Sequence, residues 1–414
     1  MNKFFSFWDF ISKIILYLQP VFAIPLYFTV LVNNPPFWVS LIISLIPLAL
    51  RYQQQKVIFK RTLFDFPILI FIIGSIVGFF IAGNKDTASG ALISLLASIL
   101  IYYGITSNSK LGKKYWISFG AVIILISLVF VIWFFSQGHS KQFFFNQWVF
   151  ELFKSLPKIS DFPLGLHGIG ALLSAVIPII LGALLYTGNK THRVWLAVLA
   201  LLLIFLLFLS VSGGGWIALA IGTIFILLCW RKRSIYFIIP VSSLVMGIAL
   251  FYYTHQDWLY QSFSIETLLG RINLWVKTIP LLKDVHSFWG IGLGNWSEKF
   301  NSFYHTAEIE LHNNFFQIYT DMGIVGVLAI SIAIVIFAVT AYKIVNSSES
   351  GTLKGIGIGL IGSFLGGAFF NTLDVTLTGT IVEKGSVIYL SIPFLWIWAG
   401  FLSVVYFKLF PHEK

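Results

Sequence analysis

The chain has 414 residues, of which 58% are hydrophobic and only 10% are charged, whereas a soluble domain carries about 25% charged residues. This composition excludes an ordinary soluble domain and indicates a protein with several membrane spans. The net charge of +11 would suit a nucleic-acid partner. Basic residues of membrane proteins collect in cytoplasmic loops, however, so we interpret the charge as a topology signal and expect no nucleic-acid binding.

Long apolar runs predict an all-α polytopic membrane protein with about twelve transmembrane helices. The predicted spans are 11–31, 37–50, 66–83, 88–105, 117–135, 167–187, 194–211, 214–230, 235–253, 315–342, 354–371 and 386–408. The first run is flanked by Lys3 and Lys13 and has no small-residue cleavage site. We therefore expect an uncleaved helix there, not a signal peptide.

Most of the 27 Lys and Arg residues fall in alternate connections between these spans and at the two ends. The positive-inside rule then predicts that both termini are cytoplasmic and that the hydrophilic segments 136–166 and 254–313 lie outside. The predicted organisation is nine spans in 1–253 with the outer loop 136–166, an outer helical subdomain in 254–313, and three spans in 314–414. The single cysteine, Cys229, excludes an internal disulfide and a cysteine-based metal site.

Ionisable residues are nearly absent from the predicted spans, which argues against an ion-coupled transporter. Asp321 is the one candidate for a charged pathway residue; the alternative is an acid near the positive end of a helix. The polar residues gather instead in 254–313, so we expect chemistry at the outer surface. Outside the bacterial cytoplasm no ATP or nucleotide-sugar pool exists, and a group-transfer enzyme there needs a donor that arrives already activated.

The outer segment contains GRINLWVKTIPLL, whose periodicity predicts a helix with Arg271, Trp275 and Thr278 on one side. Arg271 is the only arginine predicted outside the membrane, and a guanidinium binds phosphate oxygens in pairs. The alternative is a surface arginine on an interfacial helix. In the following FWGIGLGNW, the spacing of the glycines excludes a dinucleotide-binding loop, and we favour a turn that packs closely against another helix.

His312 and Asn313 precede the predicted tenth span. The positive end of that helix disfavours imidazolium, and a neutral imidazole can take a proton from an acceptor hydroxyl. Asn313 suits a helix cap or a group that orients the imidazole ring. The alternative role for His312 is a capping or interface residue.

Taken together, these motifs resemble the O-antigen ligase and polymerase superfamily of bacterial membrane glycosyltransferases. The resemblance rests on Arg271, Trp275, Pro280, the Gly290-x-Gly292-x-Gly294 turn, His312-Asn313 and the GIVG sequence that starts at Gly323. It implies a GT-C-like architecture and transfer of a glycan from an undecaprenyl-diphosphate-linked donor to a glycolipid or glycan acceptor at the periplasmic face of the cytoplasmic membrane. It implies His312 as general base and Arg271 as ligand of the diphosphate. It implies no cofactor, and without an outer Asp/Glu pair at metal spacing we expect no metal.

One departure from the family concerns its Ser-Arg-Gly sequence, where this chain has Gly213 in place of the arginine. Besides Arg271, the candidates for substrate binding are Trp275 and Lys277 on the same helix, Asn313 beside His312, and His167 at the start of the sixth span. The alternative for His167 is a polar residue at a helix start. The sequence does not separate ligase from polymerase, and a polysaccharide or lipid transporter is the alternative from another class.

Overall fold

The computed structural model describes part of the chain, and most of that part belongs to one of two compact units. The described ranges are 61–107, 165–209, 212–230, 265–283, 288–306, 313–349, 351–373, 380–383, 386–389 and 393–411, with Leu311 and with 41, 42, 45, 46, 48, 49 and 52. The first unit combines Met1–Ile58 with Ser107–Gly165, and the second combines Phe59–Thr106 with Leu166–Lys414. The second unit is the one described below.

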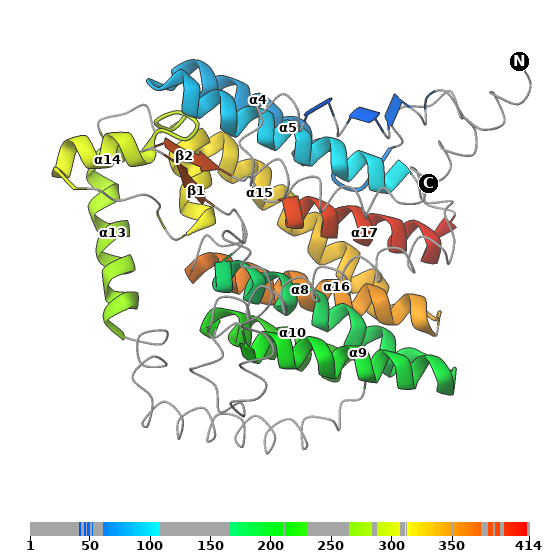
Figure 1. Ribbon diagram of the computed structural model, residues 1–414. Coiled ribbons are helices and arrows are strands. Elements are labelled where there is room, and N and C mark those ends of the chain that lie inside the picture. The colour runs from blue at the N-terminus through cyan, green and yellow to red at the C-terminus, as the bar shows by residue number, and fades with distance from the viewer. Residues whose placement is uncertain are drawn as a thin grey trace, which may run out of the picture. The chain divides into compact units, whose positions relative to one another are not determined.

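Helices dominate the described ranges (Figure 1). They are α4 (Asp65–Ile81), α5 (Lys85–Ser107), α8 (Gly165–Tyr186), α9 (Lys190–Leu209), α10 (Gly213–Trp230), α13 (Ile265–Lys283), α14 (Trp296–Tyr304), α15 (Asn314–Asn346), α16 (Thr352–Leu373) and α17 (Pro393–Leu409). Each predicted span that falls in these ranges corresponds to one of the helices. The predicted spans 11–31, 117–135 and 235–253 lie outside the described residues, and so does part of 37–50. The total number of spans and the N-in/C-in topology therefore stay predictions.

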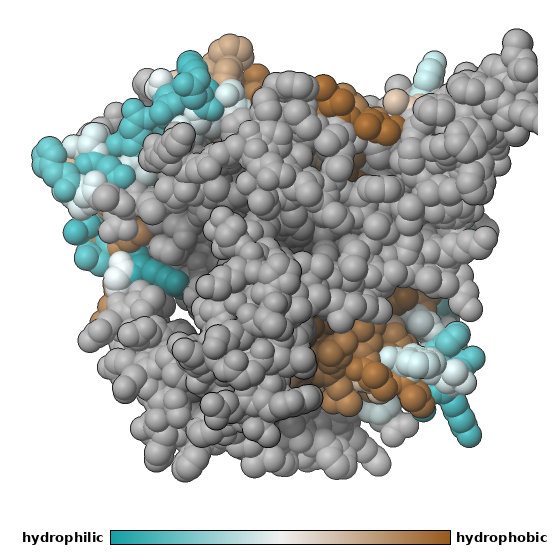
Figure 2. Space-filling view, viewed as in Figure 1, coloured by the Kyte–Doolittle hydropathy of each residue, from teal (hydrophilic) through white to brown (hydrophobic). Residues whose placement is uncertain are grey.

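Four of the described helices are long and apolar enough to cross a membrane: Lys85–Thr106, Lys190–Phe208, Asn314–Asn346 and Thr352–Phe369. Their exposed surfaces are apolar where a soluble protein would be polar. On α9, Val194, Trp195 and Leu201 are each more than 60% exposed. Figure 2 shows hydrophobic side chains gathered in the region of α9 and hydrophilic ones at one end of it. This pattern suits a helix whose outer face meets lipid.

Small residues let α16 approach its neighbours closely. A Cβ atom at Gly366 would lie 2.2 Å from the carbonyl oxygen of Ala218 on α10. The Ser363 hydroxyl donates a hydrogen bond of 2.5 Å to the carbonyl oxygen of Ala175 on α8. Membrane helices associate through such contacts, because burial of apolar side chains gives no advantage over lipid. α8, α10 and α16 thus form one tightly packed group.

Two details differ from the prediction of uninterrupted helices. The predicted span 315–342 corresponds to α15, but Gly323 interrupts it with φ 61° and ψ −148°. The predicted span 386–408 starts too early, because Ser386–Tyr389 is a strand that pairs antiparallel with Thr380–Glu383 and α17 begins at Pro393. Proline suits the first position of a helix, since its fixed φ is helical and its missing N–H is not needed there.

Candidate active site around α13 and α14

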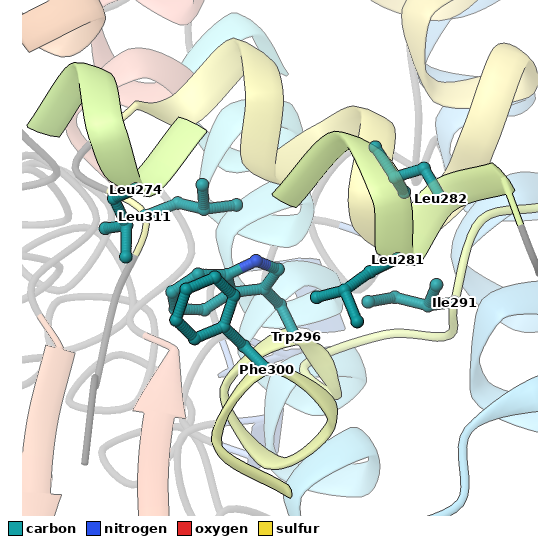
Figure 3. Packing of buried hydrophobic residues seen from close by; sticks show 7 residues of the cluster. All are labelled: Leu274, Leu281, Leu282, Ile291, Trp296, Phe300 and Leu311. Carbon is teal, nitrogen blue, oxygen red and sulfur yellow. The ribbon is translucent and has the colours of Figure 1, made fainter. Parts of the chain in front are cut away.

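The buried face of α13 forms the centre of a small apolar cluster with α14 and the segment before α15. Leu274, Leu281 and Leu282 are each less than 10% exposed, and their spacing places them on one side of the helix. They pack with Ile291, Trp296, Phe300 and Leu311. Figure 3 shows the Trp296 and Phe300 rings lying beside each other near the leucines of α13. The predicted helix around Arg271 is therefore present, and its apolar side packs against α14 and the segment before α15.

Polar contacts fix the same helix in register. The Trp296 indole donates a hydrogen bond of 3.1 Å to the Thr278 hydroxyl, which itself donates to the Leu274 carbonyl over 2.9 Å. The Tyr304 hydroxyl donates to the carbonyl oxygen of Lys277 over 2.8 Å. Buried polar groups are costly unless they are paired, so these bonds restrict how α13 can slide or rotate against α14.

Trp275 connects α13 directly to the segment that carries the predicted general base. Its indole Nε1 donates a hydrogen bond of 2.7 Å to the carbonyl oxygen of Leu311, the residue before His312. Arg271 is half-buried one turn earlier on the same helix, four residues away and therefore on the same side. The structure thus brings the Arg271 side of α13 to the chain segment of His312. His312 itself lies outside the described residues.

Asn313 caps α15. Its backbone is extended, with φ −156° and ψ 109°, and its Oδ1 accepts a hydrogen bond of 2.9 Å from the backbone N–H of Phe316. This is the geometry of an N-cap, and of the two roles considered for Asn313 the capping role is the one that the structure records. A role in substrate binding stays a prediction. The cap sets where the helix begins, and so it fixes the backbone immediately after His312.

Lys277 lies on a different side of α13 from Arg271, although both residues are on that helix. Six residues separate them, which places them about 120° apart around the axis. Lys277 is exposed, and its Nζ lies 5.7 Å from the centre of the Tyr304 ring on α14. The structure does not bring the two cations together. Substrate binding by Lys277 stays a prediction, and sequence proximity alone does not support it.

The glycine turn packs against α15 and α4, as the sequence led us to expect. Gly290, Gly292 and Gly294 have φ of 77°, 100° and 70°, a region that other residues rarely adopt. The Ile291 N–H donates to the Thr320 carbonyl over 2.7 Å, and the Leu293 N–H donates to the Gly78 carbonyl over 3.0 Å. The turn is therefore a packing element that joins the segment between α13 and α14 to α15 and α4.

Asp321, which the sequence left open as a pathway residue or a helix-end acid, belongs to this junction. Its Oδ1 accepts hydrogen bonds from the Gln317 side chain over 2.9 Å and from the Gly294 N–H over 3.3 Å. The carboxyl group is buried and holds the last glycine of the turn against α15. The signal that could have found this contact is the glycine turn itself, whose backbone N–H groups need acceptors when they are buried.

The position of the missing family arginine lies at the start of α10. The Ser212 hydroxyl accepts a hydrogen bond of 3.2 Å from the Gly215 N–H. A Cβ atom at Gly215 would lie 2.9 Å from the carbonyl oxygen of Gly170 on α8. The turn that contains Gly213 thus packs beside α8 one turn after His167, whose side chain lies outside the described part of the molecule. The contact explains the glycine at 215; nothing in the structure explains the one at 213.

Comparison with known proteins supports one family. Residues 198–331 match the family model described as O-antigen ligase. The matched stretch begins within α9 and ends within α15, so it includes the whole of the segment 254–313, which we predicted to lie outside, with Arg271, Trp275, His312 and Asn313. The predicted resemblance to the O-antigen ligase and polymerase superfamily is confirmed over this stretch. A comparison with curated proteins gave no match for the chain.

Proposed function

We propose that this chain transfers a glycan from undecaprenyl diphosphate to a hydroxyl group of an acceptor sugar at the outer face of the bacterial cytoplasmic membrane. The premise is the O-antigen ligase match over residues 198–331, which suggests glycan transfer of the ligase or polymerase type. Helices that are apolar enough to cross a membrane agree with a membrane-embedded enzyme. We favour the ligase-like reaction with a glycolipid acceptor, since the outer polar segments are short for holding a growing polysaccharide.

One observation supports the proposal above the others, namely the hydrogen bond between Trp275 and Leu311. It joins the helix of the one arginine predicted outside the membrane to the residue before the predicted base. An enzyme of this kind needs a cation for the diphosphate and a base for the acceptor within reach of one sugar.

In the proposed reaction, the acceptor hydroxyl oxygen attacks the anomeric carbon of the donor sugar. His312 takes the hydroxyl proton, the bond between the anomeric carbon and the diphosphate oxygen breaks, and undecaprenyl diphosphate leaves with the bonding electron pair. Arg271 stabilises the charge that develops on the leaving diphosphate. A direct displacement inverts the configuration at the anomeric carbon, and it proceeds without a metal ion.

The test is an assay with purified protein, an undecaprenyl-diphosphate glycan and two acceptors, a lipid A core glycolipid and a second lipid-linked glycan. Product on the glycolipid supports a ligase, and a lengthened lipid-linked glycan supports a polymerase. Movement of the donor across vesicles without a new glycosidic bond would indicate a transporter and reject the proposal. A product with retained anomeric configuration would reject direct displacement.

Arg271→Ala is expected to lower kcat/KM for the donor by roughly ten- to a hundredfold. A hydrogen bond to a charged group contributes about 1.5–3 kcal/mol, and each 1.36 kcal/mol in activation free energy is a factor of ten in rate. The measurement is initial rate against donor concentration. Arg271→Lys separates two forms of recognition, because a lysine keeps the charge and loses the paired geometry.

Asn273→Ala is the matched control for these variants, because Asn273 is exposed on the same helix and alanine suits a helix interior. It should leave kcat/KM for the donor unchanged. If kcat/KM for the donor falls little in Arg271→Lys and strongly in Arg271→Ala, the positive charge is what donor binding requires. Equal, large losses mean paired hydrogen bonds to the diphosphate. Unchanged kcat/KM in Arg271→Ala would exclude this residue from donor binding.

Trp275→Phe is expected to lower kcat by roughly tenfold while the protein stays folded. Phenylalanine keeps a ring in the cluster, although a smaller one, and removes the bond to Leu311, which is worth about 1 kcal/mol or somewhat more. We treat Trp275 as a positioning residue, so the loss should appear in kcat more than in KM for the donor. Trp195→Phe on the exposed surface of α9 is the control. If the variant loses thermal stability and total activity falls only because fewer molecules are folded, kcat per folded molecule stays unchanged. That result would show a purely structural role for Trp275.

A further inference from the structure

α13 has a second apolar face, which is exposed in the part of the chain that the structure describes. Leu269, Ile272, Val276 and Ile279 are 58%, 40%, 57% and 48% exposed. Spacings of three, four and three residues place the four side chains on one side of a helix. That side is opposite to the one that Leu274 and its neighbours bury. A helix in water would carry polar residues there, so this face requires an apolar or interfacial environment.

The attachment of α13 sets its level relative to the membrane. Trp275 is bonded to Leu311, three residues before Asn314, where the candidate span α15 begins. Further along α15, Ile324 and Leu328 are 48% and 52% exposed, as side chains in contact with lipid would be. α13 is therefore held beside the end of a helix that could cross a membrane, and in a bilayer this attachment would place it near the lipid head groups.

α13 carries a net positive charge, which complements a membrane surface of anionic phospholipids. The helix carries one acidic residue, Glu266, against the exposed Lys277 and Lys283 and the half-buried Arg271. Lys283 follows Val276 by seven residues, two turns later on the same side. Lysine side chains reach from an apolar face to phosphate groups at the membrane surface. An interfacial amphipathic helix typically combines apolar residues on one face with lysines beside them.

From the exposed face, its level and its charges, we propose that Leu269, Ile272, Val276 and Ile279 insert into the outer surface of the bilayer among anionic phospholipids. The occupant of this face is the lipid surface itself. The inference does not depend on the proposed reaction, because it concerns bulk phospholipid and not the donor. If the proposed reaction and the insertion both hold, the bilayer holds α13 on the side opposite to the Trp275 contact. It then limits how far the helix that carries Arg271 can tilt.

The test uses single-cysteine variants, for which the chain is suited because Cys229 is its only cysteine. In a Cys229→Ala background, Val276→Cys and Gly270→Cys are labelled with an environment-sensitive fluorophore and reconstituted in phosphatidylglycerol and phosphatidylcholine vesicles. Gly270 is exposed on another side of α13, and a Cβ atom there meets nothing within 4 Å. Vesicles with a nitroxide on the upper acyl chain should quench the probe at 276 and shift its emission to shorter wavelength. The probe at 270 should respond to iodide in the water instead.

Ile272→Cys repeats the measurement, so that poor folding of one variant does not decide the result. Quenching at 272 and 276 without any polyprenyl lipid supports the proposal. Quenching that appears only after a polyprenyl-diphosphate glycan is added would assign the face to the donor lipid and overturn it. Crosslinking between two copies through residue 276 would assign the face to self-association. Equal iodide quenching at 270, 272 and 276 would show that the face lies in water.

Discussion

Glycan transfer by a His312→Ala variant is expected to fall by about 10²–10⁴-fold, the range that a positioned general base contributes. Leu311, directly before His312, is held by the Trp275 indole, and Asn313, directly after it, caps α15. Removal of the imidazole leaves both backbone contacts in place, so the protein should fold normally. The measurement is the single-turnover rate of product formation at saturating donor and acceptor.

His192→Ala is the control for this variant, since His192 is exposed in the first turn of α9 and bonds to Asn189 through its backbone N–H. Its transfer rate should equal that of the unmodified protein. A His312→Gln variant tests the chemistry more narrowly, because glutamine keeps a polar side chain that cannot act as a base near neutral pH. Unchanged product formation in both His312 variants would reject the base assignment while leaving the family match intact.

The sequence predicted the positions of the described spans well because a single quantity, the hydropathy of a long run of residues, determines them. A membrane helix needs a long apolar run, so α9 and α16 could be located from hydropathy alone. The failure at 386–408 has the same origin. Short apolar runs such as Ser386–Tyr389 suit a strand or a helix equally by hydropathy, and the strand depends on pairing with Thr380–Glu383, a contact that a hydropathy window does not include.

The candidate site was predictable in its order along the chain and less so in its geometry. Helical spacing placed Arg271 and Trp275 on one side of α13, and helix-end chemistry indicated the Asn313 cap. The partner of Trp275 could not be predicted, because its indole donates to a backbone carbonyl, and every residue has one. The side-chain identity of Leu311 therefore gives no hint of the bond. Asp321 was ambiguous for a related reason, since one of its two partners is the backbone N–H of Gly294.

Gly323 interrupts α15 at the point where the glycine turn crosses it. At φ 61° and ψ −148° it occupies a region that is open almost only to glycine. The Ile324 N–H, which an intact helix would direct to its own backbone, donates instead to the Phe288 carbonyl over 3.1 Å. Hydropathy showed none of this, because glycine is common in membrane helices. The break gives the glycine turn its backbone partners, and with them the position of the segment that carries the predicted site.

Gly323→Ala is therefore expected to destabilise the protein severely and to abolish transfer. Backbone strain alone costs about 1–3 kcal/mol, and a Cβ atom would lie 2.3 Å from the Phe288 carbonyl oxygen, so the turn must also move. Two other glycines separate the cost of the strained backbone from the cost of the contact with Phe288. Gly351 has φ 109° with nothing within 4 Å of a Cβ atom, whereas Gly270 has neither strain nor contact.

Thermal unfolding of the detergent-solubilised variants measures each contribution. Gly270→Ala should be neutral or more stable by about 0.5–1 kcal/mol, since alanine favours a helix. Gly351→Ala should lose only the cost of the strained backbone and keep its transfer activity, because Gly351 lies in the connection between α15 and α16. Gly323→Ala should lose clearly more than Gly351→Ala. Equal losses of stability at 323 and 351 would mean that the contact with Phe288 adds nothing, and that the break in α15 does not position the glycine turn.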